Sequence, residues 1–287
     1  MHPIYFVEDI CTDFAGFNNL ANIYSAAQSS GDSEIVFDLS YVRRFDANMV
    51  SPLAVIKLRL NLSGKKVSFR GLRGGVERGL RSTGFFGDVP PSPLQSTIPF
   101  SQFGLEEAKK FASYTDIYLR GKGIPKMSIE LRKKFLEGLD EIFNNAAIHS
   151  SSPGGVFCSG QAIKEGARLE FVIADAGVGM KNNIKNSLGL ELSAPDAINW
   201  SMSGSNTTRL GDMPGGLGLK ILREFIQLNK GEIIVVSDAG YWSFREDRVL
   251  SLPLATAFPG TAVNVEIKTN DTSRYYLASE GDAGFFF

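Results

Sequence analysis

The sequence predicts a mixed α/β fold of the α+β class, built from two segments of different character. Four prolines fall within Gly84–Phe100, which excludes a regular helix there and indicates a connector. Before the connector, short β-rich runs alternate with helical runs, as in a parallel βαβα unit. After it, helices accompany a mainly antiparallel set of strands, which predicts an α/β sandwich of two layers.

This pattern divides the chain into a first domain at 1–90, a proline-rich linker at 91–103, a second domain at 104–270 and an aromatic tail at 271–287. In the first domain, turn residues bound the strands, and the helical runs stop at Ser or Gly. The predicted strands are Ile4–Ile10, Glu34–Leu39 and Lys66–Arg70, and the predicted helices are Phe14–Gln28, Asn48–Leu62 and Val76–Thr83.

The second domain begins with helices, of which the longer starts at Ser128 as N-cap. Strand-like runs follow, interrupted by a polar, glycine-rich stretch in which no element is expected. The predicted helices are Leu105–Leu119, Ser128–His149 and Leu217–Leu228, and the predicted strands are Val156–Ile163, Arg168–Ala174, Glu232–Ser237, Gly240–Phe244 and Ala262–Lys268.

Composition bounds the class of protein without indicating its chemistry. The 287 residues carry 30 basic and 31 acidic side chains, so no excess of charge favours nucleic acid or an anionic membrane as the partner. No apolar run reaches the roughly 18–20 residues of a membrane helix, and no export signal is evident at the N-terminus. Cys11 and Cys158 match no metal or redox spacing, so two free thiols and a cytoplasmic location are expected.

The first candidate motif is the pair Glu141 and Asn145 on the long helix. Residues four apart share one helix face, so the carboxylate and the amide project to the same side. A carboxylate can deprotonate a nucleophile, and an amide oxygen suits Mg²⁺ as a ligand. Taken alone, such a pair is more often a solvated helix face.

The second motif is Asp175, Gly177, Gly179 and Met180, directly after an apolar strand. An acidic side chain at a strand end can accept a hydrogen bond from an exocyclic amine, and the glycines allow the backbone to approach a flat ring. An ordinary Asp-x-Gly turn is the alternative for the isolated motif.

The third motif is Gly215-Gly216-Leu217-Gly218-Leu219, which opens the last helix. Unpaired N–H groups at a helix N-terminus form a natural phosphate site. No Gly-Lys-Ser/Thr follows and no strand leads directly into the motif, so it is neither a Walker A loop nor a dinucleotide-binding fingerprint.

In combination, Glu-x-x-x-Asn-Ala, then Asp-x-Gly-x-Gly, then Gly-Gly-Leu-Gly-Leu resemble the motifs of the GHKL ATPases (gyrase, histidine kinase and MutL type). Gly260-Thr261 is similar to the family's final motif, and the resemblance covers about Leu105–Lys268. It implies a Bergerat-type ATP-binding fold with Mg²⁺ on Asn145 and the adenine amino group on Asp175. The other nucleotide contacts that it implies are Gly177, Gly179, Met180, Gly215, Gly216, Leu217, Gly218, Leu219 and Thr261.

Two further assignments follow from the resemblance. Ser201–Pro214 would form a lid over ATP, with Arg209 either reaching the phosphates or remaining solvated. Glu141 stands where hydrolysing members and anti-sigma serine kinases carry the catalytic base, and the string through His149 is most similar to those kinases. We expect His149 itself to be a helix-end or packing residue.

The first domain resembles a STAS domain, the fold of the anti-anti-sigma factors that those kinases phosphorylate. Ala47 stands where the family carries its phosphorylated serine, and an alanine cannot accept a phosphoryl group. Ser51 lies one helical turn further on and is not expected to replace it. A small βαβ domain of another kind is the alternative.

The sequence thus predicts a Mg²⁺-ATP-binding regulatory protein with slow ATP hydrolysis or phosphoryl transfer, acting as a GHKL ATPase or a serine/threonine kinase with Glu141 as base. The alternative is a non-catalytic, nucleotide-gated interaction module of the partner-switching kind. The expected partners are a STAS-type or sigma-type regulator or a second copy of the chain, with no nucleic acid and no membrane. The terminal Phe285–Phe287 either packs on the domain or docks on a partner.

Overall fold

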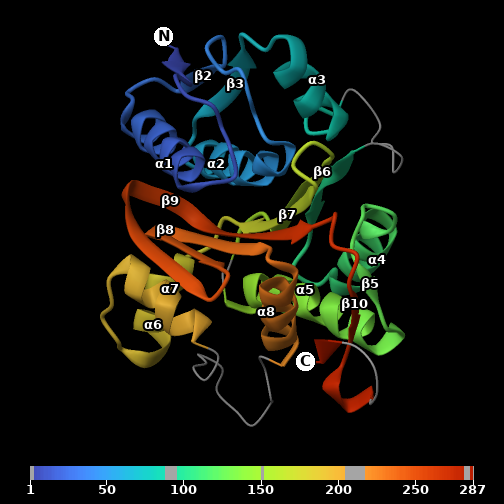
Figure 1. Cartoon of the computed structure of the whole chain (residues 1–287). Coiled ribbons are helices and arrows are strands. Elements are labelled where there is room, and N and C mark those ends of the chain that lie inside the picture. Colours follow the sequence, from blue (N-terminus) through green and yellow to red (C-terminus); the bar gives the residue numbers. More distant parts are fainter. Residues whose placement is uncertain (1–2, 88–95, 150–151, 204–216, 281–284, 287) are drawn as a thin grey trace.

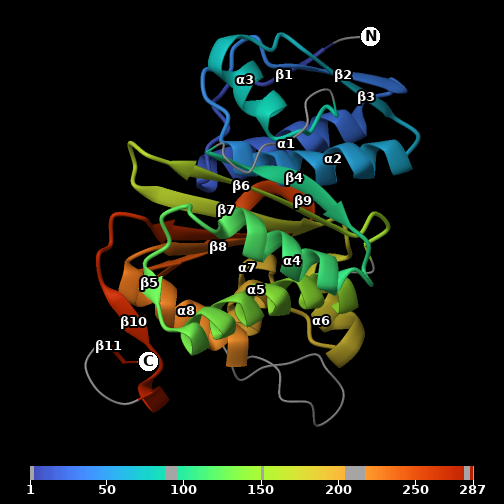
Figure 2. The same ribbon diagram turned by 90° about the vertical axis from the view of Figure 1, so that its right-hand side faces the viewer.

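The computed structural model describes residues 3–87, 96–149, 152–203, 217–280 and 285–286. These residues are arranged in layers: a three-stranded sheet, a pair of helices, a five-stranded sheet and a second set of helices (Figure 1). The view turned by 90° shows the same order, with the first pair of helices between the two sheets (Figure 2). The mixed α/β class expected from the sequence is confirmed.

The first sheet and its helices belong to residues 3–87, which we call the N-terminal unit. All its strand pairs are parallel, in the order β1-β2-β3, as expected of strands joined through helices. The strands are β1 (Ile4–Tyr5), β2 (Glu34–Asp38) and β3 (Lys66–Arg70), and the helices are α1 (Phe14–Ser29), α2 (Val50–Leu62) and α3 (Gly74–Ser82), with a 3-10 turn at Ala47–Met49 before α2.

Local signals explain where some of these elements begin and end. Asp13 caps α1, because its carboxylate accepts a hydrogen bond from the Gly16 N–H at 2.8 Å. The first strand is shorter than the predicted Ile4–Ile10, since Ile10 pairs only through an isolated bridge to Phe45.

The five-stranded sheet has the order β4-β6-β7-β9-β8, and every neighbouring pair is antiparallel, as predicted. Its strands are β4 (Thr97–Phe103), β6 (Val156–Ile163), β7 (Arg168–Asp175), β8 (Glu232–Arg245) and β9 (Arg248–Lys268). The two predicted strands Glu232–Ser237 and Gly240–Phe244 are one strand, β8, interrupted by register shifts at Asp238.

Five helices cover one face of this sheet, which we call its inner face (Figure 2). They are α4 (Ala108–Leu119), α5 (Ile129–His149), α6 (Gly179–Leu188), α7 (Ala194–Met202) and α8 (Leu217–Asn229). A small parallel sheet of order β11-β10-β5 adjoins them, formed by β5 (Lys126–Met127), β10 (Arg274–Tyr276) and β11 (Phe285–Phe286).

The five-stranded sheet is apolar on both faces. Alternate residues of β7 divide between two cores: Phe171 and Ile173 pack with the helices of the inner face, whereas Val172 and Ala174 pack with the N-terminal unit. The side chains of β8 alternate between the same two cores. The opposite, outer face of the sheet is therefore covered by α1 and α2, and the core of the N-terminal unit is continuous with it.

A buried polar patch lies in the same interface. The Asn48 side chain is fully buried and donates to Asn264 Oδ1 on β9 at 3.1 Å. The Ser51 hydroxyl lies 2.7 Å from Ser159 Oγ on β6. The Ala47 N–H donates to Gln161 Oε1 at 2.9 Å. Three residues of the segment Ala47–Ser51 are thus joined to the second half of the chain by hydrogen bonds.

The predicted linker 91–103 is wrong in its second half, because Thr97–Phe103 forms β4. Pro99 fits there because β4 is an edge strand, and its pairing with β6 shifts in register between Ile98 and Ser101. The short strands β5, β10 and β11 were not predicted, and neither were α6 and α7, which lie in the polar stretch taken as irregular. The first half of β9, which continues the hairpin with β8, was also missed.

Candidate functional site

The predicted site residues on the sheet lie in register at one end of it. Asp175 is the last residue of β7 and pairs with Thr261 on β9, which pairs in turn with Ser237 on β8. The Asp175 side chain is buried, with 3% of the residue exposed. A row of three polar side chains on adjacent strands therefore marks this end of the sheet, which we call the Asp175 end.

The chain turns sharply after Asp175. The Gly177 N–H donates to Asp175 Oδ1 at 2.8 Å, so the carboxylate holds the turn that follows it. Helix α6 begins at Gly179, where φ is +79°, a conformation that favours glycine. A Cβ atom at Gly179 would also lie 2.4 Å from Asp238 Oδ2. This position is restricted to glycine by both its backbone conformation and its neighbour.

Ser237 and Thr261 fix the turn to the sheet. The Met180 N–H donates to Ser237 Oγ at 2.9 Å, and Ser237 Oγ lies 2.9 Å from Thr261 Oγ1. Thr261, expected only as a nucleotide contact, therefore also supports the turn through Ser237. On the other side, the Ala176 N–H donates to Ser152 Oγ at 3.1 Å.

Asp238 places a second carboxylate beside the turn. Its Oδ2 atom is buried and has no hydrogen-bond partner among the residues that the structure describes. Burial raises the pKa of this carboxyl group, and the nearby Lys181 opposes the effect. The residue itself has φ of +52° at the bulge in β8, which directs the strand past the start of α6.

Helix α5 ends near the Asp175 end of the sheet, whereas helix α8 begins there. Helix α5 leads toward β6, whose first residue pairs with Asp175. Helix α8 leads toward the other end of the sheet, where β8 begins at Glu232 opposite Glu266. The two helices are therefore antiparallel, with the end of α5 and the start of α8 on the same side.

An aromatic contact sets the register of these helices. The rings of Phe135 on α5 and Phe225 on α8 lie 5.5 Å apart. Glu141 is six residues after Phe135, and Leu219 is six residues before Phe225, so the two lie at about the same level when both helices rise about 1.5 Å per residue. By the same count, Asn145 lies beyond the first turn of α8.

The two side chains predicted on α5, those of Glu141 and Asn145, are half-buried. Next to them, Asp140 was not predicted as a special residue. Burial, reinforced by Glu137, raises the pKa of Asp140 to about 6, and its Oδ1 atom has no hydrogen-bond partner within the described chain. Asp140 therefore loses its proton at a higher pH than an ordinary aspartate.

Part of the predicted site lies outside the described residues, namely Gly215, Gly216, Arg209 and most of the predicted lid. The remaining predicted phosphate contacts, Leu217, Gly218 and Leu219, form the first turn of α8.

Sequence reasoning missed Ser237, Asp238 and Ser152. Each is a small polar residue at a strand end or in a loop, and only the pairing of strands brings it to the Asp175 end. The signal required was the pairing of β8 with β9 for Ser237 and Asp238 and that of β6 with β7 for Ser152, and the sequence does not reveal these pairings.

No protein-family model matches the chain, and a search of curated proteins finds no match either. Within the described residues, no three His, Cys, Asp or Glu side chains are grouped to hold a metal ion. The helices in the same part of the chain include none with the length and apolarity needed to cross a membrane.

Replacing Gly179 by Ala tests the turn. The substitution forces a side chain into a left-handed conformation and against Asp238, so we expect a loss of about 1–3 kcal/mol in unfolding free energy, measured by urea denaturation. Gly75→Ala is the matched control, because Gly75 lies in α3 with no atom within 4 Å of the added Cβ. Equal stability of the two variants would contradict the assignment.

Asp140→Asn tests the raised pKa. Because the folded-state pKa of about 6 exceeds the unfolded value, ionisation of Asp140 opposes folding, and its destabilising effect grows as the pH rises through 4 to 6. The variant should be more stable than the wild type by about 1 kcal/mol at pH 8, after allowance for solvent screening, and equal to it near pH 3.

Thermal unfolding across this pH range is the measurement. Asp116→Asn should behave in the opposite way, because the hydrogen bond from Arg132 and the ion pair with Arg120 lower the pKa of Asp116. A difference between Asp140→Asn and the wild type that does not change with pH would refute the argument.

Proposed function

We propose that the chain is a GHKL-type protein that binds Mg²⁺-ATP at the Asp175 end, with slow ATP hydrolysis or phosphoryl transfer. The observation that carries this proposal is the convergence of three separate motifs. The Asp175 turn, the Glu141–Asn145 side of α5 and the first turn of α8 all lie toward one end of the sheet. This common location is what supports a single shared ligand.

The buried turn suits the base of the nucleotide. The Asp175 carboxylate is held by the Gly177 N–H and would accept a hydrogen bond from the adenine amino group. Gly177 presents backbone without a side chain, so a flat ring can approach closely there, and Gly179 permits the left-handed conformation with which α6 begins. Thr261 and Met180 border the same turn, linked to it through Ser237.

The start of α8 suits the phosphates. The N–H groups of its first turn have no partner within the helix and lie at the positive end of the helix dipole, where phosphate oxygens bind favourably. Asn145, at the level beyond this first turn, offers one amide oxygen to Mg²⁺. That single donor fits Mg²⁺, which retains waters and takes its other ligands from the phosphates. When bound, the ion would neutralise charge on the phosphates.

Glu141 is the proposed base. It lies one turn before Asn145 on the same face of α5, so its carboxylate points to the side where the phosphates would bind. There it would orient a water or hydroxyl group and accept its proton. Its half-buried position fits a group that must meet both substrate and solvent.

A specific observation favours the non-catalytic alternative, a nucleotide-gated interaction module. In the resemblance to STAS domains, Ala47 replaces the phosphorylated serine, and Ala47 is buried with 4% exposure. Ser51 is fully buried, with its hydroxyl beside Ser159 Oγ. The N-terminal unit then serves as a fixed regulatory element and not as a phosphoryl acceptor. We propose a cytoplasmic setting, in line with the free Cys11 and Cys158.

Titration calorimetry with a non-hydrolysable ATP analogue and Mg²⁺ tests binding. The wild type should bind, and Asn145→Ala should weaken binding in the presence of Mg²⁺ by about tenfold or more, which corresponds to about 1.4 kcal/mol. Asn144→Ala is the matched control, since Asn144 is the neighbouring residue on a different side of α5. A wild-type protein that does not bind the analogue would refute the proposal.

Release of phosphate from ATP tests the catalytic role. Glu141→Ala should abolish turnover and leave the affinity for the analogue within about threefold, because the base acts in the reaction and not in binding. Glu137→Ala, one turn earlier, should keep the wild-type rate. Turnover by Glu141→Ala at the wild-type rate would exclude Glu141 as the base. ATP binding without any phosphate release or transfer to a partner would identify the non-catalytic module.

A further inference from the structure

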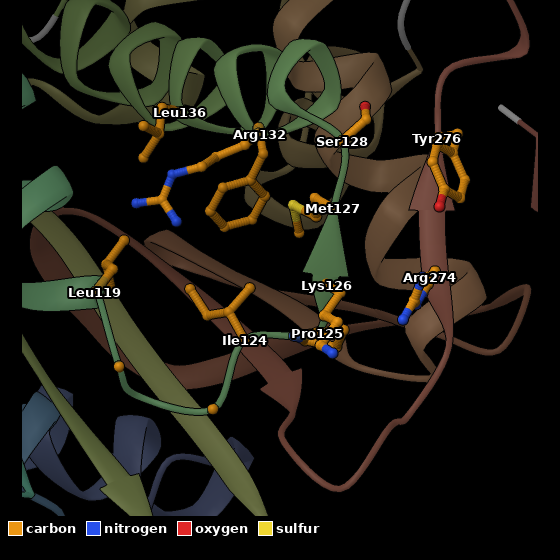
Figure 3. A pocket seen from close by; sticks show the side chains of 13 residues that line it. Leu119, Ile124, Pro125, Lys126, Met127, Ser128, Arg132, Leu136, Arg274 and Tyr276 are labelled. Atoms are coloured by element: carbon orange, nitrogen blue, oxygen red, sulfur yellow. The ribbon is translucent and has the colours of Figure 1, made fainter. Parts of the chain in front are cut away.

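A pocket of about 760 Å³ lies at the other end of α5, away from the proposed nucleotide site (Figure 3). It is bounded by the end of α4, by β5 and the first turns of α5, and by β10. Its volume is within the range of roughly 300–1,000 Å³ that is typical of small-molecule sites. It is lined by Leu119, Gly121, Gly123, Ile124, Pro125, Lys126, Met127, Ser128, Arg132, Phe135, Leu136, Arg274 and Tyr276.

One part of the lining is apolar. Ile124 and Met127 come from the segment before α5, and Phe135 and Leu136 come from α5 itself. Phe135 is anchored in the inner core against Phe225, so this wall is held firmly by packing. Such a surface suits a hydrocarbon or aromatic body.

The charged part of the lining is entirely cationic. Lys126, Arg132 and Arg274 contribute, and no Asp or Glu is among the lining residues. Arg132 already has a partner, because its guanidinium donates to Asp116 at 2.9 Å. At the rim, Glu280 accepts a hydrogen bond from Ser128 at 2.6 Å and from the Leu277 N–H.

Lys126 and Arg274 are the unusual pair. They are register partners on the adjacent parallel strands β5 and β10, so their side chains extend from neighbouring positions on the same side (Figure 3). Both are exposed, and neither forms an ion pair within the described part of the chain. Like charges in neighbouring positions of a sheet destabilise the pairing. An anion bound between the two cations would be attracted to both and would offset their mutual repulsion.

We propose that this pocket binds an amphipathic organic carboxylate of the fatty-acid type. The carboxylate would lie between Lys126 and Arg274, where a guanidinium and an ammonium group can share its oxygens. The apolar body would extend over Ile124, Met127 and Phe135. Neither a neutral alcohol of the same length nor a short carboxylate satisfies both parts of the lining.

Decanoate, below its micelle concentration, is the probe, and the full chain is tested without nucleotide so that the result does not depend on the proposed ATP site. In calorimetry and thermal unfolding, decanoate should bind the wild type and raise its midpoint, whereas decanol and acetate should bind at least tenfold more weakly. The double variant Lys126→Gln, Arg274→Gln should bind decanoate at least tenfold more weakly, with an unchanged circular dichroism spectrum.

Two controls separate this site from general charge effects. Lys109→Gln with Arg78→Gln removes the same charge from exposed positions on α4 and α3, and it should leave decanoate binding unchanged. Lys126→Gln alone should raise the unfolding midpoint of the ligand-free protein, because it relieves the repulsion from Arg274. Equal affinity of decanoate for the double variant and the wild type, or no binding to either, overturns the proposal.

Discussion

The architecture depends on one constraint: the five-stranded sheet is apolar on both faces, so both must be covered. Alternation along β7 and β8 sends one set of side chains to the helices and the other set to α1 and α2. An antiparallel sheet commonly leaves one face to solvent, where polar residues alternate with apolar ones. Here removal of the N-terminal unit would expose Val172, Ala174 and Val236 to water.

This constraint limits where function can reside. The N-terminal unit occupies the outer face. In addition to apolar packing, polar contacts such as that of Asn48 with Asn264 determine how the unit is positioned on the sheet. The inner face is covered by five helices, whose side chains pack against it. What remains are the ends and edges of the helix layer, and both proposed binding sites lie there. The Asp175 end has the chemistry of a nucleotide site, and the start of α5 has that of an anion pocket.

The sequence predicted those elements whose local signals are strong. The runs that form β6 and β7 are apolar, β-rich and bounded by turns, and their limits were predicted to within one residue. Helices α6 and α7 were missed because their polar and glycine-rich sequence favours a loop, and only Ile184, Ile198 and a few other side chains fix them to the core. Residues of the site that act through pairing between strands, above all Ser237, had no local signal.

Helix α5 connects the two proposed sites and also determines how independent they are. Its 21 residues run from the pocket to the Asp175 end, and Ile129 and Asn145 are about 24 Å apart at 1.5 Å per residue. That distance exceeds the Debye length of about 8 Å at physiological salt, so a charge bound at one site is screened from the other. Any coupling would have to pass through the packing of α5, for example through Phe135 and Phe225. Variants of Lys126 on β5 and of Asn145 on α5 therefore act on separate sites, and binding at each site can be measured with the other site unchanged.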